Sequence, residues 1–246
     1  MRLQTYRLSE RPDLAQRFGD LDGAWPAFMD ADPTADLYYG HLDRYADYVL
    51  VAVDADDPGR LLGRACSIPM TGSHDALPDG GWGAAIRRGT RDRLAGRTPD
   101  LVSALEVTLR PDAQGLGLSG RMVQALRANT RALGFDALVV PVRPNHKHLE
   151  PHVPMEEYAA RTRADGLPED PWLRVHARQG ATIEGVAPLS MAVPGTLEQW
   201  RGWTGLPFDT SGPVVVPGAL APVQADLAQG VAVYVEPNVW MRHDLG

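Results

Sequence analysis

A polar turn followed by a glycine loop lies between a strand pattern and a helix pattern in the middle of this chain. The segment 110–120 reads Arg-Pro-Asp-Ala-Gln-Gly-Leu-Gly-Leu-Ser-Gly. Before it, 103–109 alternates as a strand does, and after it apolar residues recur at helical spacing as far as Gly134. An almost unbroken apolar run at 135–142 then predicts a buried strand. The order strand, loop, helix, strand predicts a right-handed βαβ crossover with backbone N–H groups exposed at the helix start, where a phosphate can bind.

Two phosphate-bearing cofactors match this loop. Gly115, Gly117 and Gly120 spell the dinucleotide pattern G-x-G-x-x-G. Gln114, Gly117 and Ser119 nearly spell the acyl-CoA pattern Q/R-x-x-G-x-G/A, with a serine as the last small residue. In a dinucleotide site the first glycine follows the strand almost directly, and an acidic residue about 20 positions on holds the ribose. Five residues precede Gly115 here and the next strand ends without a carboxylate, so the acyl-CoA interpretation is favoured.

The rest of the chain predicts one α/β domain. Short helices are expected at 12–18 and 24–29, and strands at 48–53 and 61–68 form a hairpin. Segments 71–100 and 145–169 are expected as insertions beside the core. Helices are expected at 172–179 and from Thr196 to Trp203, and strands at 181–193, 231–235 and 239–243, with breaks at Pro188 and Pro237.

This order of elements, with the loop at its centre, resembles the GNAT acetyltransferase superfamily. The resemblance implies a mixed, mostly antiparallel central sheet flanked by helices, a splayed central strand pair and, in this chain, a C-terminal extension. Pro141, in a strand that otherwise reads as central, fits that splay. The resemblance also implies that acetyl-CoA enters the gap between the splayed strands. The expected CoA-binding residues are Val107, Leu109, Gln114, Gly115, Leu116, Gly117, Leu118, Ser119, Gly120 and Asn145.

The chemistry of acyl transfer requires a base for the amine and an acid near the departing thiolate. Glu106, on the polar face of the strand that should line the cleft, is the candidate general base. His176 is the candidate acid because, four residues before Gly180, it holds the place of a tyrosine that many members of the superfamily use. Glu236 and Asn238, which flank Pro237, are expected to face the acceptor.

The composition of the chain limits the kinds of partner that it can be expected to bind. A formal charge of −7 argues against nucleic acid, and without a membrane span or a signal peptide the expected location is the cytoplasm. Cys66, the single cysteine, is expected in the core. A metal is not expected: the histidines at 146, 148 and 152 lack zinc-like spacing, and their loop is expected to cover the acceptor.

We therefore expect an enzyme that moves an acetyl or other short acyl group from CoA to the amine of a small molecule, by direct attack on the thioester. A homodimer is a further expectation. Two alternatives stay open: a non-catalytic acyl-CoA-binding or regulatory protein, and a protein that binds NADP.

Overall fold

The computed structural model describes residues 2–23 and 25–246, so the expected helix start at Ala24 lies outside the described residues. The strands are β1 (Leu3–Arg7), β2 (Val49–Asp54), β3 (Asp57–Met70), β4 (Leu101–Leu109), β5 (Ala137–Val142), β6 (Thr182–Thr196), β7 (Gly212–Val214), β8 (Val223–Asp226) and β9 (Val231–Asp244). The α-helices are α1 (Asp36–Tyr39), α2 (Gly81–Leu94), α3 (Leu118–Ala132), α4 (Met155–Ala159), α5 (Pro171–Arg178) and α6 (Leu197–Thr204). Short 3-10 helices cover Pro12–Leu21, Ala27–Ala31, Leu42–Tyr48, Pro111–Ala113 and Lys147–Leu149.

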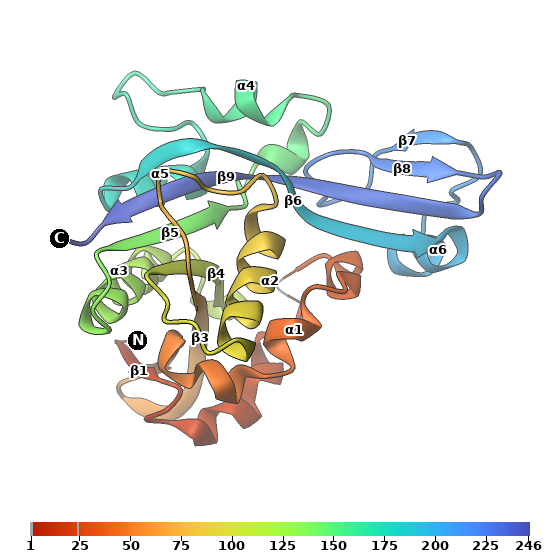
Figure 1. The fold of residues 1–246 in the computed structure, drawn as a ribbon. Helices are drawn as coiled ribbons and strands as arrows, with labels where there is room; N and C mark the ends of the chain where they lie inside the picture. The colour runs from red at the N-terminus through yellow and green to blue at the C-terminus, as the bar shows by residue number, and fades with distance from the viewer. Residues whose placement is uncertain (1, 24) are drawn as a thin grey trace.

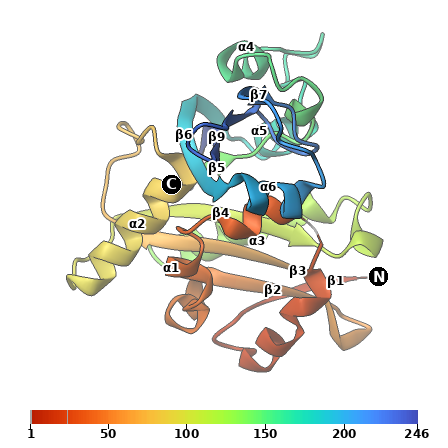
Figure 2. The same ribbon diagram turned by 90° about the vertical axis from the view of Figure 1, so that its right-hand side faces the viewer.

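All the described strands join one mixed sheet in the order β1-β2-β3-β4-β5-β9-β8-β7, with β6 paired to β9. Neighbours are antiparallel except β4 and β5, which run parallel because α3 carries the chain across between them. Figure 2 shows β2, β3 and β4 in the lower part of the molecule and β6 and β9 above them. The predicted βαβ crossover and the mostly antiparallel sheet are confirmed.

Helices cover both faces of the sheet. One apolar cluster packs the 3-10 helices of the N-terminal region with α2 and α6, and the other packs α3, α4 and α5. Every side chain of β5 is buried, as expected for a strand with apolar residues on both faces. In α3 the residues at helical spacing, Leu118, Met122 and Leu126, are buried against the sheet.

The parallel pair β4 and β5 is joined along a short stretch. Val102 pairs with Leu138 and Ser103 with Val139, and no further pairing is found in the described chain. Beyond these positions the two strands separate, which is the predicted splay. The structure thus leaves the final residues of β4 facing a gap in the centre of the sheet.

A bulge in β4 changes the predicted alternation of its side chains. The pairing of β3 and β4 shifts between Cys66 and Ser67, which lie opposite Glu106 and Ala104 and leave Leu105 without a partner. Leu105 therefore packs against the cluster on the α2 side, whereas Val107 packs on the α3 side. The alternation expected across 103–109 would place Leu105, Val107 and Leu109 on one face, and this was wrong for Leu105.

The C-terminal strands extend beyond the rest of the sheet. Figure 1 shows β6 and β9 running past β5 toward α6, β7 and β8, which is the expected C-terminal extension. On one edge β9 pairs with β5 near its end and with β8 near its start, and on the other edge it pairs with β6. Strand β9 continues through Pro237, so the expected break there was wrong. The irregularity lies in β6, where 188–190 bulge out between Ala187 and Met191.

The segment 71–100 contributes more than a surface loop, because α2 buries Ala85 and Ile86 in the core. Gly81 begins this helix with φ of 41°, and a Cβ there would collide with Ser190 Oγ in the β6 bulge. Within the described ranges, no helix is both long and apolar enough to cross a membrane.

Candidate active site

A cleft of about 500 Å³ opens over the glycine loop, at the end of β4 and beside α3 and α5. We call it the loop cleft. It is lined by Trp25, Pro26, Val107, Thr108, Leu109, Gln114, Gly115, Gly117, Leu118, Ser119, Arg143, Asn145, Pro171, Trp172 and Val175. These include eight of the ten expected CoA-binding residues. The structure does not bring Leu116 or Gly120 into the lining, and the side chain of Leu116 points to solvent.

The glycine loop has the backbone geometry of an anion cradle. Gly115 and Gly117 take left-handed conformations, with φ of 74° and 72°, that other residues adopt at a cost. Gly117 is also the residue that precedes α3, and no side chain caps the helix there. The first N–H groups of the helix are therefore open to an anion, which the helix dipole also favours. Gln114 ties the loop to β4, since its Nε2 donates to Leu109 O at 3.2 Å.

The free edge of β4 can hold an extended ligand. The N–H of Arg110 donates to Leu62 O of β3 at 2.9 Å. Because backbone groups alternate along a strand, those of Val107 and Leu109 point the other way, toward the gap left by β5. Both residues line the loop cleft, so the residues present fit the pantetheine arm and pyrophosphate of an acyl-CoA.

A second cavity, of about 370 Å³, lies on the other side of the gap. We call it the acidic cavity. It is lined by Trp25, Met29, Asp30, Ala35, Asp36, Tyr39, Arg64, Trp82, Leu105, Glu106, Pro141, Arg143, Met191, Glu236 and Asn238. Trp25 and Arg143 line both hollows, so the two meet at these side chains. Glu106, Glu236 and Asn238 all line the acidic cavity, and the roles expected for them stay predictions.

Glu106 is buried and held by two neighbours. Arg64 Nη2 donates to its two carboxylate oxygens at 2.8 and 2.9 Å, and Thr108 Oγ1 donates to Oε1 at 2.5 Å. A carboxylate offers about four acceptor positions, so one position on Oε2 is left for a further donor. The Arg64 guanidinium itself lies over the Phe18 ring, 4.7 Å from the ring centre.

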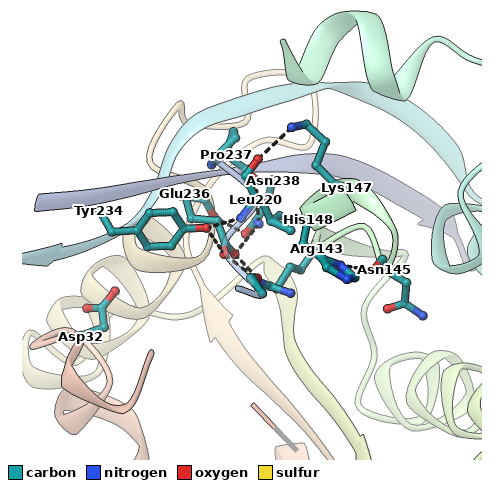
Figure 3. Close-up of polar contacts among 12 residues, drawn as sticks. Asp32, Arg143, Asn145, Lys147, His148, Leu220, Tyr234, Glu236, Pro237 and Asn238 are labelled. Atoms are coloured by element: carbon teal, nitrogen blue, oxygen red, sulfur yellow. Dashed lines mark hydrogen bonds and ion pairs between the residues drawn. The ribbon is translucent and has the colours of Figure 1, made fainter. Parts of the chain in front are cut away.

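Glu236 is fully buried and its acceptor positions are all used (Figure 3). Arg143 Nε donates to Oε1 at 3.1 Å and to Oε2 at 2.9 Å. Tyr234 Oη donates to Oε2 at 2.7 Å, and Asn238 Nδ2 donates to Oε1 at 3.0 Å. Glu236 therefore holds Arg143 and has no position left for substrate.

His176 does not lie in either hollow. Its ring is buried against Trp172, 4.6 Å away between ring centres, and its Nδ1 lies 3.0 Å from Nε2 of the equally buried His243. Trp172 and Val175, on the same helix, face the loop cleft instead. Burial, and then the neighbouring His243, lower the pKa of His176 to about 3, so the ring is neutral near pH 7 and lacks the acidic imidazolium proton that a departing thiolate would take up. The predicted acid role is not supported.

The segment 145–169 contributes Asn145 to the loop cleft and no residue to the acidic cavity. Met155 and Tyr158 pack into the core near α5, and Tyr158 Oη donates to Asp170 at 2.9 Å. The segment therefore does not line the acidic cavity, and the cover expected over the acceptor stays a prediction. No group of three potential metal ligands gathers in the described part of the chain. Cys66 is buried, as expected, and burial raises the pKa of its thiol.

Several lining residues were missed by the sequence analysis. Trp25, Asp30, Asp36 and Tyr39 come from the short N-terminal helices and turns, Trp82 lies in the first turn of α2, and Arg64 lies on β3. They share no spacing in the sequence, because the fold brings them together from separate elements. Arg143 had a weak signal, as a charged residue directly after a buried strand.

Comparisons with known proteins agree with the geometry. A scan against protein-family models finds no match. The arginine N-acetyltransferase avaD of Aspergillus versicolor is 35% identical over 265 aligned positions, which cover 96% of this chain and 91% of that protein. The loading GNATL domain of CurA from Lyngbya majuscula has a TM-score of 0.61 at 16% identity, over 99% of this chain and 96% of that one. The GphF GNAT-like decarboxylase in complex with isobutyryl-CoA has a TM-score of 0.57 at 19% identity, over the full length of both chains. The solved structures share the fold, and the curated relative shows the family: this chain belongs to the GNAT superfamily of acyl-CoA-dependent N-acyltransferases.

Proposed function

We propose that this enzyme transfers an acetyl group from acetyl-CoA to a small cationic amine, and that the acceptor is arginine or a close guanidine-bearing relative of it. The observation that carries the proposal is the acidic cavity, which meets the loop cleft at Arg143 and Trp25. A donor in the cleft and an acceptor in the cavity would face each other across the gap between β4 and β5.

The charges of the acidic cavity favour a cation. Four of its described lining residues are carboxylates and two are guanidinium groups, which leaves a net charge of −2. Glu106 and Glu236 are neutralised by Arg64 and Arg143. Asp30 and Asp36 form no ion pair with any residue in the described ranges. Burial, and then the charge of Asp22, raise the pKa of the Asp30 carboxyl, and a bound cation would relieve that penalty.

Aromatic walls support the same acceptor. Trp25, Tyr39 and Trp82 line the cavity, and the rings of Tyr39 and Trp82 are stacked with their centres 6.4 Å apart. A flat guanidinium binds well over such faces, where a cation–π contact contributes about 0.5–2 kcal/mol. The relative avaD, named as an arginine N-acetyltransferase, supports arginine over other cations.

We assign the general base to Glu106. Its remaining acceptor position on Oε2 can take a proton from the attacking amine, directly or through one water molecule. For the donor, we assign the pyrophosphate to the glycine loop and the pantetheine arm to the backbone of Val107 and Leu109. Asn145, at the rim of the loop cleft, is a further proposed contact. The dinucleotide alternative loses its support because the chain belongs to the GNAT superfamily.

The proposal is tested with a panel of amines and acetyl-CoA, by following thiol release. Arginine, agmatine, lysine and tryptamine differ in their cationic group and in the carboxylate. We expect kcat/KM for arginine and agmatine to exceed that for tryptamine by at least about tenfold, and mass spectrometry of the product identifies the acetylated nitrogen. Turnover of tryptamine without turnover of arginine would overturn the proposed acceptor. Binding of acetyl-CoA without turnover of any amine would favour the non-catalytic alternative.

The expected homodimer and the expected cytoplasmic location stay predictions. The elution volume of the purified chain in gel filtration tests the first of them.

A further inference from the structure

Arg143 lies where the two hollows meet, directly after β5. It lines both the loop cleft and the acidic cavity, and among the described lining residues no other cation does so. Its side chain is 16% exposed, and its partner Glu236 is fully buried. A charged group in this position is next to the point at which a thioester in the cleft would meet an amine in the cavity.

The guanidinium of Arg143 is fixed along one edge. Nε donates to both oxygens of Glu236, and Nη2 donates to Gly218 O at 2.5 Å. The loop that carries Gly218 is held in turn, because Lys147 Nζ donates to Leu220 O at 2.8 Å. Leu220 N–H donates to Tyr234 Oη at 2.8 Å, and this hydroxyl also bonds Glu236. Figure 3 shows Tyr234, Asn238 and Arg143 around Glu236, with the Lys147 bond to Leu220 beside them.

The opposite end of the guanidinium is left for substrate. Nη1 donates to no acceptor in the residues that the structure describes. A hydrogen-bond donor stabilises a developing negative charge most effectively when the fold already holds it in place, because the protein then need not reorganise during the reaction. Arg64, the other arginine of the acidic cavity, does not reach the loop cleft, and its Nη2 is used by Glu106.

We propose that Arg143 is a catalytic residue whose Nη1 binds the thioester oxygen and stabilises the oxyanion formed there. This inference rests on the proposed acyl transfer but does not depend on which amine is the acceptor. The amine lone pair forms the new C–N bond, and the carbonyl π electrons move to the oxygen next to Arg143. The nitrogen loses a proton to Glu106. The oxygen electrons then restore the carbonyl, and the C–S bond breaks with its electron pair on the CoA sulfur, which takes up a proton from solvent.

The test compares R143Q with the wild-type enzyme. Since R143Q leaves Glu236 buried without its counter-charge, the double variant R143Q/E236Q is measured beside it, and thermal unfolding shows that each variant is folded. R242Q is the matched control: Arg242, on β9, also pairs with a glutamate, Glu184 of β6, and it lines neither hollow. Three quantities are recorded for each protein: kcat and KM with arginine and with agmatine, the Kd for CoA, and the slow hydrolysis of acetyl-CoA without amine.

We expect R143Q and the double variant to lower kcat about 100-fold with both acceptors, with the Kd for CoA changed by less than about threefold. Hydrolysis should fall by a similar factor, because attack by water passes through the same oxyanion. R242Q should stay within about twofold of the wild type.

A loss that appears with arginine but not with agmatine would overturn the proposal, because Arg143 would then bind the acceptor carboxylate. A tenfold weaker Kd for CoA with kcat retained would also overturn it. If no amine is turned over but hydrolysis still depends on Arg143, the proposed acceptor fails and the role of Arg143 stands.

Discussion

Two buried glutamates reach the acidic cavity, and they differ in the acceptor positions that remain. Glu236 has none, since Arg143, Tyr234 and Asn238 use its oxygens. Glu106 keeps one position on Oε2. A general base must accept a hydrogen bond from the group it deprotonates, so this difference supports Glu106 as the proposed base.

This assignment predicts the effect of Glu106→Gln. The amide keeps the size of the side chain but cannot take the proton, so we expect kcat/KM for the amine to fall about 100-fold or more. The Kd for CoA should change little, because Glu106 does not line the loop cleft. Steady-state kinetics with thiol detection and titration with CoA measure the two effects.

Glu184→Gln is the matched control for this change. Glu184 also pairs with an arginine, Arg242, but lines neither hollow, so its removal should leave kcat/KM within about twofold. Equal losses in the two variants would mean that Glu106 acts only on the stability of the fold. Full activity of E106Q would remove Glu106 from the chemistry.

Single functional residues could be predicted from the sequence where their position depends on the residues next to them in the chain. Glu106 stood out as a charge in an alternating strand, and Glu236 and Asn238 as polar residues around a strand proline. The position of His176 was predicted wrongly because helical spacing shows which residues share a face of the helix. It does not show what that face contacts. It cannot tell that Trp172 and Val175 would take the cleft and leave His176 against His243.

Among the elements, the glycine loop was the most predictable, because its shape depends on consecutive residues. Gly115 and Gly117 both take positive φ, and a Cβ at either position would meet open space, so conformation and not crowding requires glycine. The strand bulges were less predictable. The bulge at Leu105 in β4 and the one at 188–190 in β6 each depend on the register of a partner strand, which the local pattern does not contain.

The loop geometry predicts a binding defect in Gly117→Ala. A left-handed alanine costs about 1–2 kcal/mol, and the free loop escapes this cost by turning its N–H groups away from the cradle. Acetyl-CoA must then restore the strained loop, so we expect its Kd to rise about tenfold. Titration calorimetry with CoA measures the change.

Gly134→Ala tests whether strain alone explains that effect. Gly134 follows the other end of α3 with φ of 91° and open space, so alanine there meets a similar backbone cost away from the loop cleft. We expect Gly134→Ala to lower the stability in urea unfolding but to leave the Kd for CoA unchanged. A Kd that rises equally in both variants would argue against a direct role of the Gly117 backbone.

On the scale of the whole molecule, the acidic cavity is a product of the complete fold. Its lining runs from Trp25 to Asn238 and draws on β3, β4, β9 and the N-terminal helices. The sequence predicted the βαβ unit with its glycine loop, and the resemblance to the GNAT superfamily predicted the mostly antiparallel sheet and its splay. Most of the other residues that line the acidic cavity could not be predicted, because no pattern within a segment encodes contacts between segments that lie far apart in the chain.

The His176–His243 pair also joins distant parts of the chain, since it links α5 to the end of β9. Burial is the main reason that the pKa of His176 falls to about 3 and that of His243 to about 4, with smaller effects of His243 on the first and of Arg127 on the second. Both rings are neutral in the folded protein, and their facing nitrogens lie 3.0 Å apart. An added proton would place a charge in a buried site without a counter-charge.

The pair should therefore make the folded protein sensitive to mild acid. An exposed histidine titrates near pH 6.5, so below this pH the unfolded chain binds protons that the folded chain does not. The contribution of the pair to stability is complete above about pH 6.5 and is lost as the pH falls toward 4. Between pH 7 and pH 5 we expect the free energy of unfolding to drop by about 3 kcal/mol on account of these two rings.

Urea unfolding across this range measures the drop. H176Q/H243Q should reduce the slope of the free energy of unfolding against pH, whatever the variant's stability at pH 7. His74→Gln, at a partly exposed site, should keep the slope of the wild type. An unchanged slope in the double variant would mean that the buried pair does not control the acid sensitivity.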